Sequence, residues 1–261
     1  MGRFDEMILI RKQNIESLRG GSSIDVLRAK SRESVLLDVE TALMEYGVFQ
    51  CIPGLGHQNL KDELHRSEVY LKWAKAFEAC GCCALALYLD EEFYGTSLKL
   101  LKFLKEKIEI PIICRGAFFT PEQIYSAYLG GADALTMCVE YFKPEELREL
   151  YDLIADLGMT PILEVKSIDQ IEIALKFNPE ILAVDWSGSS SQSLAEWRNS
   201  LHNLRRIPKL AVEVGTEKHR VLDAVECGFD GILMAPELLE QSSPAALVSS
   251  FLELARDQSN M

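Results

Sequence analysis

The sequence predicts an α/β fold, a (β/α)8 TIM barrel that follows an N-terminal helical extension. Eight short apolar runs alternate with eight segments of helical periodicity from residue 47 to the end of the chain. Each run is apolar on both faces, which is typical of parallel strands that helices cover on both sides. Eight strand–helix pairs are the number that closes a barrel of this class.

The expected elements follow one another in a regular order. The apolar runs that we expect to be strands are 48–52, 84–89, 111–114, 134–139, 160–165, 181–185, 209–214 and 231–235. The amphipathic segments that we expect to be helices are 68–81, 97–107, 121–131, 144–158, 168–177, 193–204, 218–228 and 244–257. Pro121 and Pro144 stand at first-turn positions with glutamate directly after them, which favours a helix start. The stretch 53–67 predicts a long loop.

The first third of the chain decides between two fold classes. A doubly wound open sheet is the alternative, but PGLGHQ at 53–58 does not match the glycine-rich phosphate turn that follows the first strand of such sheets. Residues 1–46 precede the first apolar run and contain helix-like segments at 7–20 and 33–46. We therefore expect a helical extension at 1–46 that caps or flanks the barrel, and the barrel itself at 47–261.

The composition excludes several classes of partner. The chain has 261 residues, of which 48% are apolar, and a formal net charge of −13. This acidity argues against nucleic acid and against anionic membranes as partners. The sequence has no apolar run long enough for a transmembrane helix, and charged residues interrupt its first residues, so we expect no signal peptide either. These features favour a soluble, cytoplasmic protein whose oligomeric state stays open.

The cysteines fit the same compartment. Seven of them are present, at positions 51, 80, 82, 83, 114, 138 and 227, and they form no disulfide framework. The cluster CGCC at 80–83 has no second pair of cysteines or histidines at the spacing that a metal site needs. We therefore expect small core residues, and we predict neither a metal nor a cofactor.

Charged residues stand where the expected strands end. In a barrel of this class the working groups lie at the carboxyl ends of the strands and in the loops that follow. These positions are 51–53, Asp90, Arg115, Glu140, Glu164, Lys166, Asp185, Glu213 and Ala235. A carboxylate inside an apolar run costs several kcal/mol unless it is paired or hydrated. Glu164 and Glu213 therefore mark a site, unless Arg115 or Lys166 merely neutralises them.

A series of short stretches resembles one family. The stretches are FYGTSL (93–98), PIICRGAFFTPEQIY (111–125), GGADAL (130–135), LGMTPILEV (157–165), AVDWS (183–187), AVEVG (211–215) and GFDGILMAPELL (228–239). In order and spacing they resemble the indole-3-glycerol phosphate synthases, from about residue 68 to residue 256. The helical extension before the barrel also looks like theirs.

The resemblance implies a reaction and a set of roles. The family closes an indole ring on a phosphorylated, anthranilate-derived ketone, with loss of carbon dioxide and water. It needs a general acid on the third strand, a general base on the fifth, and a phosphate grip near the seventh and eighth. By resemblance, Glu164 matches the base, Glu213 matches the seventh-strand glutamate, and Gly215 matches a glycine at the phosphate end.

The sequence departs from the family pattern at the catalytic strand ends. The third-strand lysine falls on Arg115, and a guanidinium with a pKa above about 12 holds anions but donates protons poorly. The sixth-strand asparagine falls on Asp185. A first-strand glutamate and lysine, followed by a serine turn, are replaced by Cys51, Ile52 and Pro53.

The phosphate end departs as well. Gly215, Thr216 and Ala235 remain as candidate phosphate contacts, but Ala235 is followed by Pro236 and Glu237. Proline removes a backbone N–H, and a carboxylate carries the wrong charge for an anion. We therefore expect a phosphorylated ligand to bind weakly.

Three functions stay open at this point. The first is a synthase-type carbon–carbon lyase with Glu164 as base, Arg115 as its electrostatic partner, Glu213 and Asp185 nearby, and weak activity. The second is a barrel of this descent with another chemistry or another small-molecule ligand, and the third is a non-catalytic binding barrel. Because Arg115 and Glu164 stand at the ends of the third and fifth expected strands, we predict that they lie within ion-pair distance at one end of the barrel.

Overall fold

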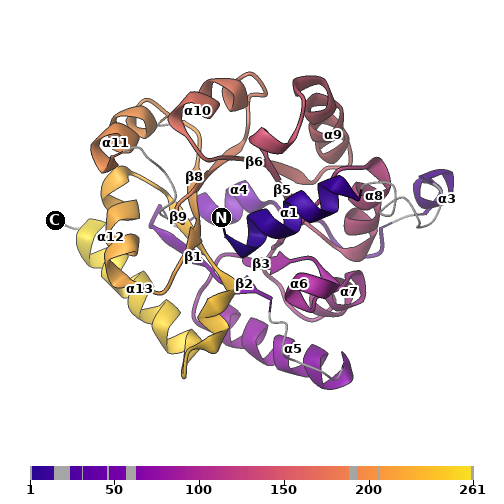
Figure 1. The fold of residues 1–261 in the computed structure, drawn as a ribbon. Coiled ribbons are helices and arrows are strands. Elements are labelled where there is room, and N and C mark those ends of the chain that lie inside the picture. Colours follow the sequence, from indigo (N-terminus) through magenta and orange to yellow (C-terminus); the bar gives the residue numbers. More distant parts are fainter. Residues whose placement is uncertain are drawn as a thin grey trace.

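A single sheet of nine parallel strand segments forms the centre of the computed structural model (Figure 1). The structure describes residues 2–14, 24–30, 32–45, 47–56, 63–187, 193–204 and 206–259. The strands are β1 (Gln50–Ile52), β2 (Gly54–Leu55), β3 (Leu85–Tyr88), β4 (Ile112–Arg115), β5 (Ala134–Cys138), β6 (Thr160–Val165), β7 (Ile181–Asp185), β8 (Lys209–Val214) and β9 (Gly231–Met234).

The first two segments are two halves of one barrel strand. Only Pro53 separates β1 from β2; β1 pairs with β9, and β2 pairs with β3. Proline has no N–H to donate, which interrupts the pairing, yet its carbonyl still accepts a hydrogen bond of 3.0 Å from the amide of Ala86. The ring therefore closes with eight strands, and the predicted (β/α)8 TIM barrel is confirmed.

Helices surround the barrel and pack their apolar faces against it (Figure 1). The outer helices are α5 (Glu63–Ala79), α7 (Leu98–Lys105), α8 (Pro121–Gly130), α9 (Pro144–Asp156), α10 (Ile168–Leu175), α11 (Leu194–His202), α12 (Lys218–Cys227) and α13 (Pro244–Ser259). Short helices follow three of the strands: α6 (Glu91–Tyr94), η1 (Val139–Tyr141) and η2 (Pro236–Glu240). The expected long loop at 53–67 is wrong in part, because β2 and the start of α5 lie within it. No helix of the described residues is long and apolar enough to cross a membrane.

Buried apolar side chains form two layers. One lies between the strands and the outer helices, and the other fills the inside of the barrel. The N-terminal helices α1 (Arg3–Gln13) and α4 (Val39–Met44) contribute to the inner layer, whereas α3 (Ile24–Arg28) packs beside α8. In Figure 1, α1 crosses the front of the barrel and α4 lies behind it. The two helices therefore cover opposite ends of the barrel.

The expected helix at 33–46 is wrong in its first half, because the chain is extended before α4 begins. Asp133, directly before β5, holds this extended segment in place. Its carboxylate accepts hydrogen bonds from Arg32 (3.0 Å), the amide of Leu37 (3.0 Å) and Lys105 (2.6 Å). A buried carboxylate with these partners outweighs the helical propensity of the segment. The helix expected at 7–20 begins earlier, at Arg3, and ends at Gln13; positions 15–20 lie outside the described residues.

Candidate active site

Arg115, the last residue of β4, lies at the centre of the barrel mouth. Its side chain is fully buried. One guanidinium nitrogen, Nη2, donates to Oε2 of Glu164 at 2.6 Å, and the other, Nη1, donates to Oε1 of Glu213. The predicted ion pair between Arg115 and Glu164 is confirmed. The carboxylates of Glu164 and Glu213 therefore share one cation, which can balance only one of their two charges.

Glu213 reaches the mouth through an irregularity of β8. Leu210 and Val212 belong to the inner layer, so strand alternation would direct Glu213 outward, as it does Ala211. A β-bulge between Ala211 and Val214 shifts the pairing with β9, and Glu213 has a left-handed φ of 56°. For a residue other than glycine this conformation costs about 1–2 kcal/mol. Such strain is typical of functional sites, and here it turns the carboxylate toward Arg115.

Tyr88, the last residue of β3, completes this cluster. Its hydroxyl donates to Oε1 of Glu213 at 2.8 Å and accepts from Nη1 of Arg115 at 2.7 Å. Tyr88 is not among the site residues predicted from the sequence. The sequence does contain an indication of its role. Alternation along 84–89 places Tyr88 on the same face as the small residues Ala84 and Ala86, where a large side chain with a polar end is unusual.

The cluster has unusual proton affinities. Burial raises the pKa of Glu164 to about 7, although the neighbouring Arg115 guanidinium opposes the shift. Burial also raises the pKa of Glu213 and the pKa of Tyr88. Burial disfavours the charged form of Arg115, but the Glu164 carboxylate and its neighbours outweigh burial and raise the pKa of Arg115. Glu164 can therefore give or take a proton near neutral pH, whereas Arg115 cannot.

Lys166, two residues after Glu164, points to other partners. Its ammonium group contacts Asp5 of α1 and, at 2.6 Å, the carboxylate of Glu140. It also lies 2.7 Å from the hydroxyl of Tyr141. Of the two cations that could have neutralised Glu164, the structure therefore selects Arg115.

Asp185 ends β7 beside this cluster. One of its carboxylate oxygens accepts a hydrogen bond of 2.8 Å from the amide of Ser187, which closes a tight turn. Its negative charge contributes to the raised pKa of Glu164. The structure thus brings Asp185 near the predicted site, but its hydrogen bond with Ser187 fixes a loop.

The predicted phosphate end is rich in carboxylates. The carboxylate of Glu217 lies against Gly215: a Cβ atom at position 215 would stand 2.4 Å from Oε2 of Glu217. The amide of Ala235 already donates to the carbonyl of Val214 at 2.9 Å. Glu237, in the first turn of η2, contributes to the raised pKa of Glu213. The carboxylate of Glu217 thus lies against Gly215, which the sequence predicts to contact phosphate together with Thr216 and Ala235.

Helix α1 covers the cluster. The ring of Phe4 lies 4.1 Å from Cζ of Arg115 and meets the ring of Tyr88 edge to face, with 5.8 Å between centroids. Arg11, near the other end of the helix, forms a bidentate ion pair with Asp90, at 2.7 and 3.0 Å. A cation over an aromatic face is stabilised, most strongly where water is excluded. No local pattern in the sequence predicts that Phe4 lies here.

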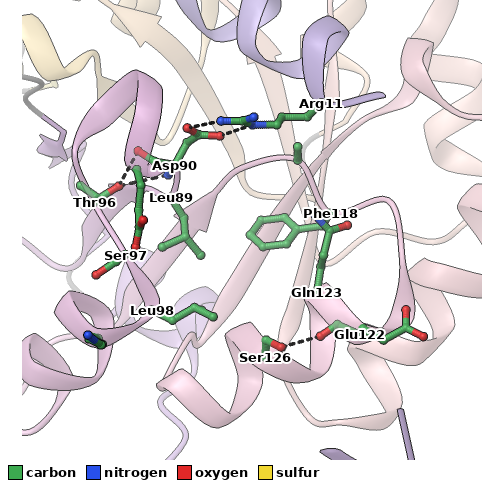
Figure 2. A pocket seen from close by; sticks show the side chains of 13 residues that line it. Arg11, Leu89, Asp90, Thr96, Ser97, Leu98, Phe118, Glu122, Gln123 and Ser126 are labelled. Carbon is green, nitrogen blue, oxygen red and sulfur yellow. Dashed lines mark hydrogen bonds and ion pairs between the residues drawn. The ribbon is translucent and has the colours of Figure 1, made fainter. Parts of the chain in front are cut away.

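A cavity of about 510 Å³ opens beside the mouth, between the loops that follow β3 and β4 (Figure 2). Leu89, Leu98 and Phe118 give it an apolar wall, and the Arg11–Asp90 pair stands at its edge. Its polar lining includes Ser97, Glu122, Gln123 and Ser126. The volume is within the range of small-molecule sites. Across the described part of the chain, no three histidine, cysteine, aspartate or glutamate side chains are grouped to hold a metal ion.

The fold and this cluster define a TIM-barrel protein with an acid–base group of side chains at the end of the barrel where such proteins carry their sites. A family model described as indole-3-glycerol phosphate synthase matches residues 60–209. The chain therefore belongs to this family.

Relatives named indole-3-glycerol phosphate synthase are similar to the chain at low identity. One from Bacillus cereus (strain AH187) is 28% identical over 181 residues, which are 66% of this chain and 70% of the relative. One from Bacillus mycoides (strain KBAB4) is 27% identical over 190 residues, 70% of this chain and 72% of the relative. Another, from Bacillus cereus (strain AH820), is 25% identical over 249 residues, 92% and 93% of the two chains.

Proposed function

We propose that the chain is an indole-3-glycerol phosphate synthase-like barrel with a rewritten active site, and that its ring-closing activity is about a hundredfold or more below that of an ordinary enzyme. The observation that carries this proposal is Arg115, which is fully buried and paired with Glu164 and Glu213. By resemblance to the family, a lysine that donates a proton would stand there. Loss of a general acid typically lowers a rate by about 10²–10⁴.

The remaining groups support slow proton transfer. Glu164, with a pKa of about 7, is the base in this proposal, because it is half-ionised near neutral pH. Arg115 orients the Glu164 carboxylate through the 2.6 Å contact and keeps its charge. The hydroxyl of Tyr88, which contacts Arg115, could in principle donate a proton to a substrate. Its hydrogen, however, is directed to the carboxylate of Glu213.

The phosphate end supports the same proposal. A phosphate group bound at Gly215 would approach the carboxylate of Glu217, and the amide of Ala235 is already used by Val214. We expect indole-3-glycerol phosphate to bind with a dissociation constant weaker than about 0.1 mM, or about −5.5 kcal/mol. Isothermal titration with the full chain measures this constant.

Two variants sharpen the titration. Gly215→Asp adds a carboxylate at the phosphate end, and Asn199→Asp adds the same charge on the exposed side of α11 as a control. Micromolar binding by the unaltered chain that Gly215→Asp abolishes and Asn199→Asp leaves intact would contradict the proposed loss of the phosphate grip.

A second function is favoured by the cavity beside the mouth. Its volume of about 510 Å³ and its wall of Leu89, Leu98 and Phe118 suit an apolar small molecule. In this alternative the barrel is repurposed for binding and needs no proton transfer. A ligand of this cavity would bind the unaltered chain and the Glu164→Gln variant with equal affinity, whereas a ligand of the mouth would distinguish them.

A further inference from the structure

We infer that α1 is a gate over the barrel mouth, which must move before a molecule from solution can reach the Arg115–Glu164 pair. The inference rests on the proposed function only in taking this pair as the site. In Figure 1 the helix lies across the front of the barrel, over the strand ends that carry the cluster. The gate therefore belongs to the same chain as the site that it covers.

The inner face of α1 fills the mouth with apolar side chains. Phe4, Met7 and Ile8 are at most 5% exposed and join the inner layer of the barrel. Phe4 stacks on the guanidinium of Arg115, so it occupies the approach to the cation from solution. Arg115 itself is 0% exposed, which means that no solvent reaches it while α1 is docked.

Polar contacts hold α1 to the rim of the mouth, and their partners follow three strands, β3, β5 and β6. Arg11 pairs with Asp90 after β3 and with Glu92, the latter at 2.9 Å. Asp5 contacts Lys166 after β6 and accepts a hydrogen bond of 2.9 Å from the hydroxyl of Tyr141. Lys12 donates to the carbonyl of Tyr141 after β5. These contacts are partly exposed, so salt screens them more than it screens the buried cluster below.

A short helix held in this way can leave while the barrel stays folded. α1 has 11 residues, and isolated helices of that length are marginal in water. Its stability therefore comes from docking, through the three buried apolar side chains and the rim contacts, and a docked terminal element can open locally before the whole domain unfolds. Charged pairs at the rim set how often this opening occurs.

The chain carries a reporter for this opening. Cys138 ends β5, pairs in register with Glu164, and belongs to the inner layer together with Phe4 and Met7. It is 6% exposed, and burial raises the pKa of its thiol, which slows alkylation. Cys114 is fully buried in the outer layer, away from the mouth. Release of α1 would expose Cys138 only, whereas global unfolding would expose both.

Alkylation by iodoacetamide, followed by mass spectrometry of each cysteine peptide, tests the gate in the full chain. Arg11→Glu places a carboxylate against Asp90 and Glu92 and removes their charge-assisted hydrogen bonds, so we expect Cys138 to react about tenfold faster or more. Lys72→Glu, on the exposed side of α5, makes the same change in charge and should leave the rate as it is. The rate at Cys114 should stay the same in all three proteins.

Two results would overturn the gate. One is an equal rate at Cys138 in the unaltered chain and in Arg11→Glu; the other is a parallel rise at Cys138 and Cys114. If Arg11→Glu does not fold, the same alkylation experiment is carried out on the unaltered chain at two salt concentrations. An increase from about 0.05 M to 0.5 M NaCl should raise the alkylation rate at Cys138 severalfold and leave the rate at Cys114 unchanged. No effect of salt, or an equal effect on both, refutes the gate. No ligand enters this experiment, so its outcome is independent of the proposed catalytic loss.

Discussion

Removal of the buried cation should destabilise the protein in a way that depends on pH. The change is Arg115→Met, which keeps most of the volume of the side chain and removes its charge. Glu164 and Glu213 would then lie buried without their cation. Breaking a buried ion pair by removing one partner costs about 3–5 kcal/mol. We expect a loss of that size in the free energy of unfolding at about pH 8.

The loss should be smaller at low pH. The Arg115 guanidinium opposes the shift that burial produces in both carboxyls, so its removal raises the pKa of Glu164 and of Glu213 further. Groups whose pKa is raised in the folded state stabilise it at low pH, and this stability is lost as pH rises through the folded pKa. Each unit of pKa corresponds to about 1.4 kcal/mol. At about pH 5, where Glu164 of the variant is neutral and Glu213 is more protonated than at pH 8, the loss should shrink to about 2 kcal/mol or less.

Urea unfolding at both pH values measures this effect. Arg198→Met is the control, because Arg198 forms an exposed pair with Glu226, and both side chains are more than half exposed. Exposed pairs contribute about 0–1 kcal/mol, so the control should show little loss at either pH. A loss below about 1 kcal/mol for Arg115→Met at pH 8, or an equal loss at both pH values, would refute this account of the cluster.

Two further predictions concern the same groups. The pKa of Glu164 is about 7 in the folded protein, against about 4.3 in an unfolded chain. The folded protein should therefore be about 3 kcal/mol less stable at about pH 8 than at pH 5. Urea titrations at both pH values should show that Glu164→Gln removes this difference. An unchanged pH dependence in that variant would mean that Glu164 is ionised throughout. Arg115→Lys should leave the rate of ring closure within about tenfold of that of the unaltered chain, because this substitution does not restore the phosphate grip that we propose is lost. Recovery to about 1 per second would contradict this prediction.

The barrel could be predicted because its pattern is local. Strands that are apolar on both faces are stable only when they are buried between two layers. The strand expected at 181–185, for example, has the same bounds as β7, Ile181–Asp185. The pair of Arg115 and Glu164 followed from the same pattern, since both residues close strands whose ends meet at the mouth.

The remainder of the site depends on tertiary contacts. Alternation alone directs Glu213 away from the mouth, and only the bulge in β8, which the partner strand determines, reverses it. Phe4 is distant in sequence from Arg115, and no local pattern connects the two. The segment before α4 has helical propensity but is extended, because the buried carboxylate of Asp133 binds the amide of Leu37. In each case a contact distant in sequence outweighs a local preference.

Steady-state turnover of the phosphorylated, anthranilate-derived ketone by the purified full chain tests the central claim most directly. A relative named indole-3-glycerol phosphate synthase, such as that of Bacillus mycoides, is the positive control. Because Arg115 cannot donate the proton and is held by Glu164 and Glu213, we expect a turnover of about 0.01 per second or less. A turnover in the ordinary range of about 1–10³ per second would contradict the claim that the active site is rewritten.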